Sequence, residues 1–236
     1  MRQLPLGLRF PDRATFASFL PAHNAEARSH AERVAAGAAP GLTWLCGPHG
    51  AGKTHLLHAI CAAAAAGGAR AGYVPFAELG SLGVGVLEGL PQLECLCLDD
   101  LDSVVGNADW ERAIFGVLRE VEERGGSLVI AAQSPPALAP WVLPDLGSRC
   151  SAGAVLSLRV LDEAEQVAAL QLRARVRGVE LPDETLQWLQ RRFPRDMRAL
   201  YELLDTLDKA ALAAQRRLTI PFIRGVLAEQ PRSGEQ

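Results

Sequence analysis

The chain has 236 residues, which is enough for one sizeable α/β domain and a smaller second one. Hydrophobic residues make up 49% and charged residues 22%, a balance typical of a globular protein rather than a disordered one. The net charge of −3 gives no overall basic field, so sequence-specific DNA binding is not expected. No segment reaches the length of a membrane span and no signal peptide opens the chain, so we expect a cytoplasmic location without membrane contact.

The first predicted strand is the short apolar run Leu42–Cys46. Residues 47–54 follow it directly, read GPHGAGKT, and match the P-loop pattern G-x-x-x-x-G-K-[ST] at every fixed position. Residues 55–66 are rich in Leu and Ala and predict a helix, which Gly67-Gly68 ends. This order places phosphates at a helix N-terminus, where N–H groups favour anions. A chance glycine-rich turn, the alternative, does not account for the strand and helix around the loop.

Each fixed residue of the P-loop has a chemical task. Glycines let backbone N–H groups approach phosphate oxygens without a Cβ clash. Lys53 is expected to place its charge on the β- and γ-phosphates, and Thr54 to offer its hydroxyl to Mg²⁺.

Strand and helix signals continue to alternate up to about residue 158. The helix candidate is 109–123, with apolar residues on one broad face. The strand candidates are 73–74, 94–98, 127–132 and 155–158. This alternation predicts a parallel sheet covered by helices, with ligands at the carboxyl ends of the strands.

Asp99-Asp100 follows the strand at 94–98, about 45 residues after the P-loop. In P-loop ATPases a carboxylate at this place holds Mg²⁺, and its neighbour can polarise the attacking water. The alternative is a solvated turn, since Asp is common at strand ends. The upstream P-loop favours metal contact.

Five cysteines are present, and none forms a C-x-x-C pair. Cys95 and Cys97 alternate within a strand pattern and face the same side. Buried reduced thiols are therefore expected rather than a metal site or disulfides.

After residue 158 only helix signals remain. Asp162 and Glu165 form a capping box before a helix at 167–177, and three more helices are predicted at 183–193, 196–217 and 222–227. Arg173, Arg175 and Arg177 occupy every second position of the first helix, so we interpret them as solvated or as part of a protein interface.

Two arginines are candidates for stabilising phosphoryl charge. Arg198 lies at the start of a helix and can act within the chain. Arg149 lies just before the last strand and can act across an interface, as an arginine finger. Taken singly, each is more typical of a solvated or salt-bridged arginine.

The sheet-then-helices order and GPHGAGKT resemble the AAA+ ATPases. More narrowly, nearly the whole chain resembles the Hda family of DnaA-related proteins. The resembling segments are QLPLGLRFPDRATFASFLP, GPHGAGKTHLLHA, LDDLDSV, LPDLGSRCSAG, LDEAEQVAALQLRARVRGVELP and RDMRALYELLDTLDKAALAAQRRLTIPFIRGVL. The resemblance implies an α/β fold, a P-loop AAA+ parallel sheet with helices on both faces, followed by a small all-α lid. The expected parts are a tail at 1–11, a base domain at 12–159, a lid at 160–231 and a frayed end at 232–236.

The resemblance also implies a function. Members of this family bind the sliding clamp of DNA polymerase III on DNA and promote hydrolysis of ATP bound to the initiator DnaA. This chain is then a negative regulator of replication initiation that holds ADP or ATP with Mg²⁺, and its own ATPase activity is weak or absent. AAA+ proteins often self-associate, so a homodimer is one of the expected states.

Site residues follow from the resemblance position by position. Arg149 matches the arginine finger acting in trans, Asp99 and Asp100 match the Walker B pair, and Thr54 with Asp99 are the expected Mg²⁺ ligands. The expected clamp-binding residues are Gln3, Leu4, Pro5 and Leu6. The expected nucleotide-binding residues are Asn24, Gly47, Pro48, His49, Gly50, Ala51, Gly52, Lys53, Thr54, His55 and, as the sensor 2 arginine, Arg198.

One region departs from the family pattern. Residues 131–136 read AAQSPP where relatives usually carry Asp and Arg before the prolines, so the water-positioning role of this sensor 1 region is not expected here. Two other functions stay open: a self-contained AAA+ ATPase such as a helicase-loader relative, and a non-catalytic, nucleotide-locked adaptor between clamp and partner.

Overall fold

The computed structural model describes residues 14–179, 181–192, 197–214 and 218–229. The predicted clamp-binding residues at 3–6 therefore lie outside the described residues. The chain divides between Val160 and Leu161 into two compact units, which we call the base unit and the lid unit.

The base unit is built on five parallel strands in the order β2-β3-β4-β1-β5, which confirms the predicted sheet. The strands are β1 (Gly41–Cys46), β2 (Ala71–Pro75), β3 (Cys95–Asp99), β4 (Ser127–Ala132) and β5 (Ala154–Ser157). Because all five run the same way, the segments after β1, β3 and β4 leave the sheet at one edge. These are the P-loop, the Asp99-Asp100 pair and the sensor 1 region.

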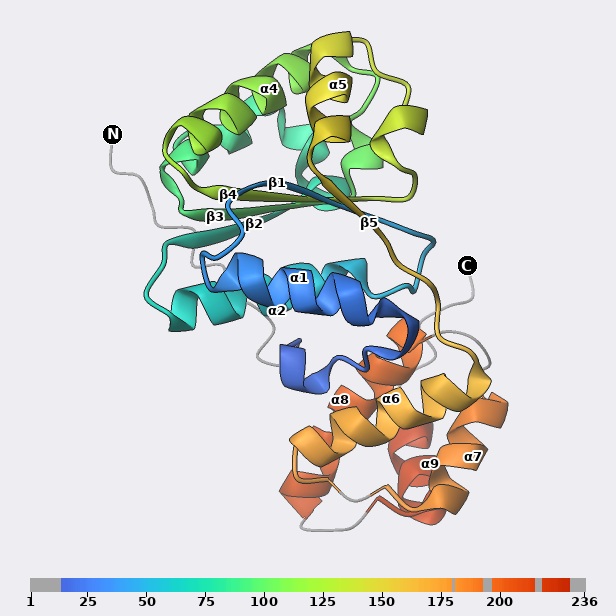
Figure 1. Ribbon diagram of the computed structural model, residues 1–236. Helices are drawn as coiled ribbons and strands as arrows, with labels where there is room; N and C mark the ends of the chain where they lie inside the picture. The colour runs from blue at the N-terminus through green and yellow to red at the C-terminus, as the bar shows by residue number, and fades with distance from the viewer. Residues whose placement is uncertain (1–13, 180, 193–196, 215–217, 230–236) are drawn as a thin grey trace. The chain divides into compact units, whose positions relative to one another are not determined.

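Helices cover both faces of this sheet (Figure 1). One face carries α1 (Ala25–Ala35) and α2 (Lys53–Ala66), and the other carries α4 (Ala108–Glu123) and α5 (Pro144–Ala152). The short helix α3 (Phe76–Leu79) follows β2. Alternate strand residues enter opposite layers, so Leu45 packs with α1 and α2 while Trp44 packs with α4 and α5. Both faces of the sheet are therefore buried, as the continuous apolar strands predict.

Three helices of the base unit are absent from the sequence-based prediction: the one-turn helix α3 and the longer helices α1 and α5. Helix α1 buries Ala27, Ala31 and Val34, whose small side chains give a weak apolar pattern. Helix α5 has only nine residues and contains Gly147 and Ser148, which lower its helix propensity. Packing against the sheet stabilises both helices where propensity does not.

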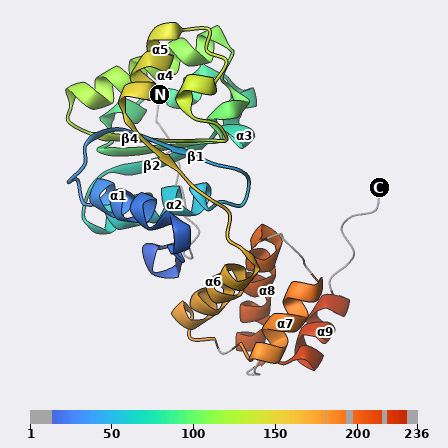
Figure 2. The same ribbon diagram turned by 45° about the vertical axis from the view of Figure 1, so that its right-hand side comes forward.

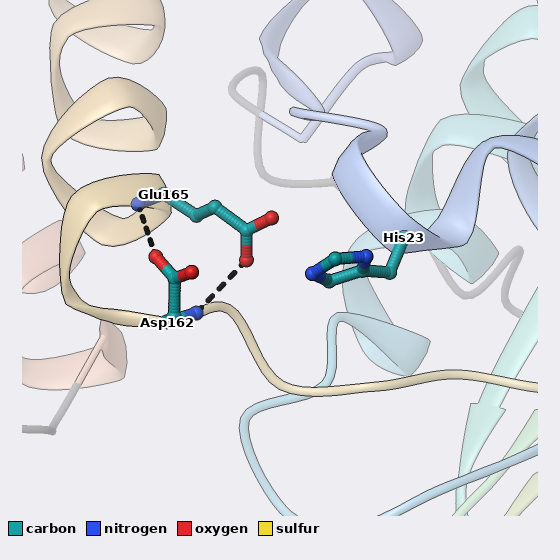
Figure 3. Close-up of side chains that lie close together, drawn as sticks. All are labelled: His23, Asp162 and Glu165. Carbon is teal, nitrogen blue, oxygen red and sulfur yellow. Dashed lines mark hydrogen bonds between the residues drawn. The ribbon is translucent and has the colours of Figure 1, made fainter.

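The lid unit contains α6 (Glu163–Val176), α7 (Asp183–Arg192), α8 (Met197–Ala214) and α9 (Ile220–Glu229) (Figure 2). Its core is mostly leucine, including Leu170, Leu186, Leu204 and Leu207. Helix α6 begins earlier than predicted, directly at its capping box (Figure 3). There the Asp162 carboxylate accepts from the Glu165 N–H at 2.8 Å, and the Glu165 carboxylate accepts from the Asp162 N–H at 2.9 Å.

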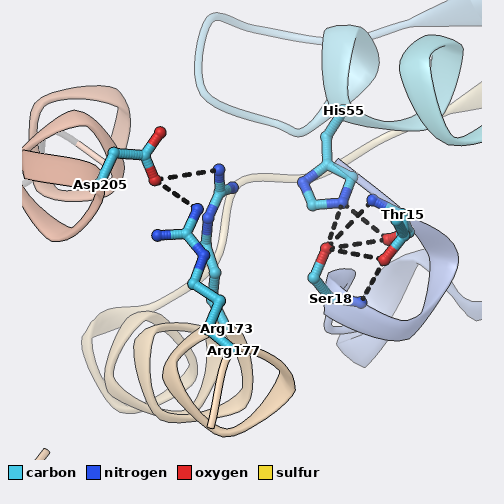
Figure 4. A network of polar contacts seen from close by, with 6 residues as sticks. All are labelled: Thr15, Ser18, His55, Arg173, Arg177 and Asp205. Carbon is cyan, nitrogen blue, oxygen red and sulfur yellow. Dashed lines mark hydrogen bonds and ion pairs between the residues drawn. The ribbon is translucent and has the colours of Figure 1, made fainter. Parts of the chain in front are cut away.

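The interpretation of the α6 arginines as solvated is wrong for two of the three. Arg173 is buried, the Arg177 side chain is only 10% exposed, and both pair with Asp205 of α8 (Figure 4). Arg173 also lies over the Tyr201 ring, 4.2 Å from its centroid. The two arginines are four residues apart and so share the face turned to α8, whereas Arg175 is exposed.

All five cysteines belong to the described residues, and they are buried and form no disulfide, as predicted. Within the described ranges, we find no helix with the length and apolar character that a membrane crossing requires.

Candidate functional site

The P-loop backbone takes up conformations that favour glycine. Gly47, Gly50 and Gly52 have φ angles of +150°, +78° and +95°. A Cβ on Gly47 would lie 2.4 Å from the Leu158 carbonyl oxygen, and one on Gly52 would lie 2.9 Å from the Phe19 ring. Helix α2 starts at Lys53, and no side chain of the described residues caps its N-terminus. The first N–H groups of this helix are thus available to an anion, and the loop fits a phosphate group.

The Lys53 side chain is buried against this loop. It is 7% exposed, and its Nζ donates to the carbonyl oxygens of Gly47 at 2.6 Å and Pro48 at 3.1 Å. Burial lowers the pKa of Lys53, while Asp99 and Asp100 oppose this shift. The ammonium group therefore lies beside the phosphate loop, and the carboxyl groups of Asp99 and Asp100 are close enough to interact with it electrostatically.

Asp99 is the last residue of β3 and is almost completely buried. Its Oδ2 accepts from the Tyr73 hydroxyl at 2.7 Å, and its Oδ1 accepts from the Asp100 N–H at 3.0 Å. These bonds fix the carboxylate while each oxygen retains a lone pair, so Asp99 fits a Mg²⁺ ligand. Sequence reasoning missed Tyr73, because only the pairing of β2 with β3 brings it to the carboxylate.

Asp100 is held in a conformation that is uncommon for a residue with a side chain. Its φ and ψ are +53° and +47°, in the left-handed region. Burial and the neighbouring Asp99 raise its pKa, while Lys53 acts in the opposite direction. A strained, partly buried carboxyl group beside a phosphate loop is typical of a functional position.

Hydrogen bonds of the Gln133 main chain join the sensor 1 region to the P-loop and to the segment after β3. The Gly47 N–H donates to the Gln133 carbonyl oxygen at 3.1 Å, and the Gln133 N–H donates to Asp102 Oδ2 at 2.8 Å. The Trp44 indole N–H also donates to the Ser134 carbonyl at 3.0 Å. The three loops at this edge of the sheet are thus connected through the main chain of Gln133 and the carboxylate of Asp102. Sequence reasoning missed Asp102, since acidic loop residues are common and nothing local distinguishes it.

The segment before α1 packs against the P-loop helix. His55 Nε2 donates to the Thr15 carbonyl at 2.9 Å and lies 3.3 Å from the Ser18 hydroxyl (Figure 4). The His55 ring also meets Phe19 edge to face, with 5.3 Å between centroids. In the described residues His55 therefore serves as an anchor for residues 15–19.

Asn24, one of the predicted nucleotide-binding residues, forms its hydrogen bonds within the base unit. It is buried, its amide donates to the Arg159 carbonyl at 2.9 Å, and its Oδ1 accepts from the Arg159 N–H at 2.8 Å. The pair ties the start of α1 to the end of the base unit. Its side chain would have to leave Arg159 to bind a base.

Arg149 lies at the opposite end of the sheet from the P-loop. It borders a cavity of about 390 Å³ with Pro40, Leu42 and Thr43, at the start of β1, whereas the P-loop follows the last residue of that strand. Its Nη1 donates to Glu122 Oε2 at 2.8 Å, and its guanidinium lies 5.6 Å from the centroid of the Phe115 ring. Arg149 is therefore directed away from the phosphate loop of its own chain.

Helix α5, which carries Arg149, is anchored through Glu111 of α4. This carboxylate is completely buried and accepts from the N–H groups of Gly106 at 2.8 Å, Val142 at 3.1 Å and Leu143 at 2.6 Å. Leu143 immediately precedes α5, so Glu111 fixes where the helix begins. The sequence pattern places Glu111 within a helix but gives no signal for these bonds.

Arg198 belongs to the first turn of α8, but its side chain lies outside the described residues. Its predicted contact with the bound nucleotide stays a prediction, as do the roles of the P-loop residues, the Walker B pair and Arg149.

Comparison with known proteins finds a family match for the lid unit and solved structures similar to most of the chain. Residues 162–227 match the family model of the Hda lid domain. Domain III of DnaA from Thermotoga maritima superposes with a TM-score of 0.73 at 21% identity, over 92% of this chain and 97% of that one. AMPPCP-bound DnaA from Aquifex aeolicus superposes with a TM-score of 0.65 at 20% identity, and the match covers 77% of this chain and 61% of that DnaA chain. The RuvB branch migration motor of Thermotoga maritima superposes with a TM-score of 0.58 at 16% identity, and the match covers 91% of this chain and 73% of that RuvB chain.

These likenesses define the fold as that of the AAA+ proteins. The lid match adds that residues 162–227 are similar to the Hda lid domain.

Proposed function

We propose that this protein is a nucleotide-bound negative regulator of replication initiation, which supplies Arg149 in trans to ATP held by DnaA. The position of Arg149 carries this proposal, because its cavity lies at the start of β1 and the P-loop lies after the end of β1. An arginine so placed cannot serve the phosphate loop of its own chain. It suits a neighbouring AAA+ molecule whose nucleotide faces it.

The P-loop of this chain would hold ADP or ATP as a structural ligand. The N–H groups at the start of α2 and the Lys53 ammonium would bind the phosphates, and Thr54 with Asp99 would hold Mg²⁺. The metal neutralises phosphate charge when bound. In line with this, the similar DnaA of Aquifex aeolicus has been solved with AMPPCP bound. The protein's own turnover would be slow, because residues 131–136 lack the Asp and Arg that the family pattern carries in this sensor 1 region.

Recruitment to DNA would come from a partner rather than from the chain itself. Gln3, Leu4, Pro5 and Leu6 are proposed to bind an apolar pocket on the sliding clamp, with the glutamine amide at its rim. Such a contact explains how a protein with a net charge of −3 is brought to DNA. Arg198 is proposed to contact the nucleotide from the lid.

The test is hydrolysis of DnaA-bound ATP in the presence of clamp-loaded DNA. Arg149→Ala should lower the stimulated rate by roughly 10³-fold, the loss typical of an arginine finger. Its clamp binding should be unchanged. Arg112→Ala is the matched control, because Arg112 is also an exposed, ion-paired arginine of the base unit but lies at the start of α4. Full stimulation by Arg149→Ala would reject the trans arginine and leave the adaptor function.

A second function has one observation in its favour. Asp99 and Asp100 lie together at the end of β3, and the charges of both act on Lys53, as in a complete ATPase site. A self-contained ATPase would turn over ATP without DnaA or clamp, and Lys53→Ala would abolish that turnover. Strong hydrolysis by the protein alone would favour this second function.

A further inference from the structure

Two side chains of α4 hold the Arg149 guanidinium. Glu122 accepts from Nη1 at 2.8 Å, and the Phe115 ring centroid lies 5.6 Å from the guanidinium carbon. These are the contacts that the structure describes for this side chain. Phe115 and Glu122 are seven residues apart, so they lie on the same face of the helix, two turns from each other. The guanidinium therefore spans a ring and a carboxylate that belong to one rigid element.

Both helices that form this arrangement are fixed in the core. Leu118 and Val121 of α4, next to Glu122, are completely buried, and so are Leu146 and Cys150 of α5 on either side of Arg149. Neither helix can shift without opening the apolar layer. The position of Glu122 is thus set by packing, and the arginine adopts the position that Glu122 and Phe115 define.

The ion pair is only partly buried. The Glu122 side chain is 33% exposed and the Arg149 side chain 47% exposed. Pairs of this exposure contribute little to stability, because water screens the charges. Such a pair is too weak to withhold the arginine from a phosphate, which offers more charge and more acceptors. It is sufficient to restrict the rotamers of a long side chain before a partner arrives.

We propose that Glu122 is a positioning residue for Arg149, which holds the guanidinium in the orientation it needs at a partner's nucleotide. This inference rests on the proposed function of Arg149. A finger that is already oriented loses less conformational freedom when the transition state forms, so the benefit appears in the rate rather than in the affinity for the partner.

The experiment compares wild type with Glu122→Gln and Glu122→Ala in the same assay of DnaA-bound ATP, at increasing concentrations of the variant. Glu122→Ala should lower the maximal rate roughly threefold, with the half-saturating concentration unchanged. Glu122→Gln should give an intermediate rate, because its amide oxygen still accepts from Nη1. Glu123→Gln is the control, since it removes the neighbouring exposed pair with Arg119 and the same charge.

The outcomes separate this inference from the proposed function. If Arg149→Ala abolishes stimulation while both Glu122 variants match wild type, the proposed role of Arg149 is supported and the positioning role of Glu122 is rejected. If the Glu122 variants stimulate more than wild type, Glu122 restrains the finger and the inference is equally rejected. If Arg149→Ala retains full stimulation, the proposed function itself fails. The folding of each variant is checked by its melting temperature.

Discussion

The Gln133 main-chain N–H donates to the Asp102 carboxylate at 2.8 Å, and this bond joins the loop after β4 to the segment after β3. On its other side, the Gln133 carbonyl accepts from the N–H of Gly47. The main chain of Gln133 is thus hydrogen-bonded both to the phosphate loop and to the segment after β3. Because Gln133 contributes only main-chain atoms to these bonds, the connection does not depend on which side chain stands at position 133.

Replacing Asp102 tests this connection. Asp102→Ala leaves the Gln133 N–H without its charged acceptor, so we expect a loss of about 1 kcal/mol in unfolding free energy. We also expect weaker binding of ADP, since the Gly47 end of the loop loses support. Urea unfolding measures the first effect and isothermal titration of ADP with Mg²⁺ the second. The control is Asp109→Ala, which removes an exposed carboxylate paired with Arg112. Equal ADP affinity in both variants would contradict the connection.

Lys53 should control nucleotide binding without being needed for folding. Adding ADP and Mg²⁺ at about 100 times the dissociation constant should stabilise the wild type by about 2.7 kcal/mol, and Lys53→Ala should lose most of this gain. Differential scanning fluorimetry with and without ADP measures it. A melting temperature of Lys53→Ala that rises as much as that of the wild type would show that the loop does not hold the phosphates.

Glu111 should be among the most sensitive positions for stability. Glu111→Ala removes a buried carboxylate that accepts from three main-chain N–H groups, so we expect a loss of about 3 kcal/mol. Glu120→Ala changes an exposed glutamate of the same helix and should stay within about 0.5 kcal/mol of wild type. Urea unfolding curves measure the unfolding free energy of both variants. A small loss for Glu111→Ala would mean that water replaces the carboxylate.

The raised pKa of Asp100 predicts a pH dependence. The folded protein holds this proton more tightly than the unfolded chain, so the stabilising contribution is fully present below the ordinary carboxyl pKa. It is lost as the pH rises through the raised pKa. Asn carries no charge and tolerates the left-handed conformation, so Asp100→Asn should be more stable than wild type near neutral pH. The difference in melting temperature should shrink as the pH falls to about 4. A constant difference would contradict this origin.

The sequence was sufficient for the parts of the fold that depend on local patterns. The buried strands are continuous apolar runs, the P-loop has a fixed spacing, and the capping box at Asp162 marks the start of the lid. Helix α5 could not be recognised, because Gly147 and Ser148 disfavour a helix that packing nevertheless stabilises.

The connections within the site were equally beyond the sequence. Tyr73 reaches Asp99 only through strand register, and Glu122 reaches Arg149 only through the packing of α4 against α5. Contacts between residues that are distant in the chain follow from tertiary structure, and a single sequence carries no record of them.

The opposite placement of Arg149 and the P-loop gives the base unit a direction. They lie near the two ends of β1. Under the proposed function, a contact that brings Arg149 to the nucleotide of a partner joins two different patches and is therefore heterologous. Such a contact uses the end of the base unit that carries Arg149, and the phosphate loop of this chain remains at the other end.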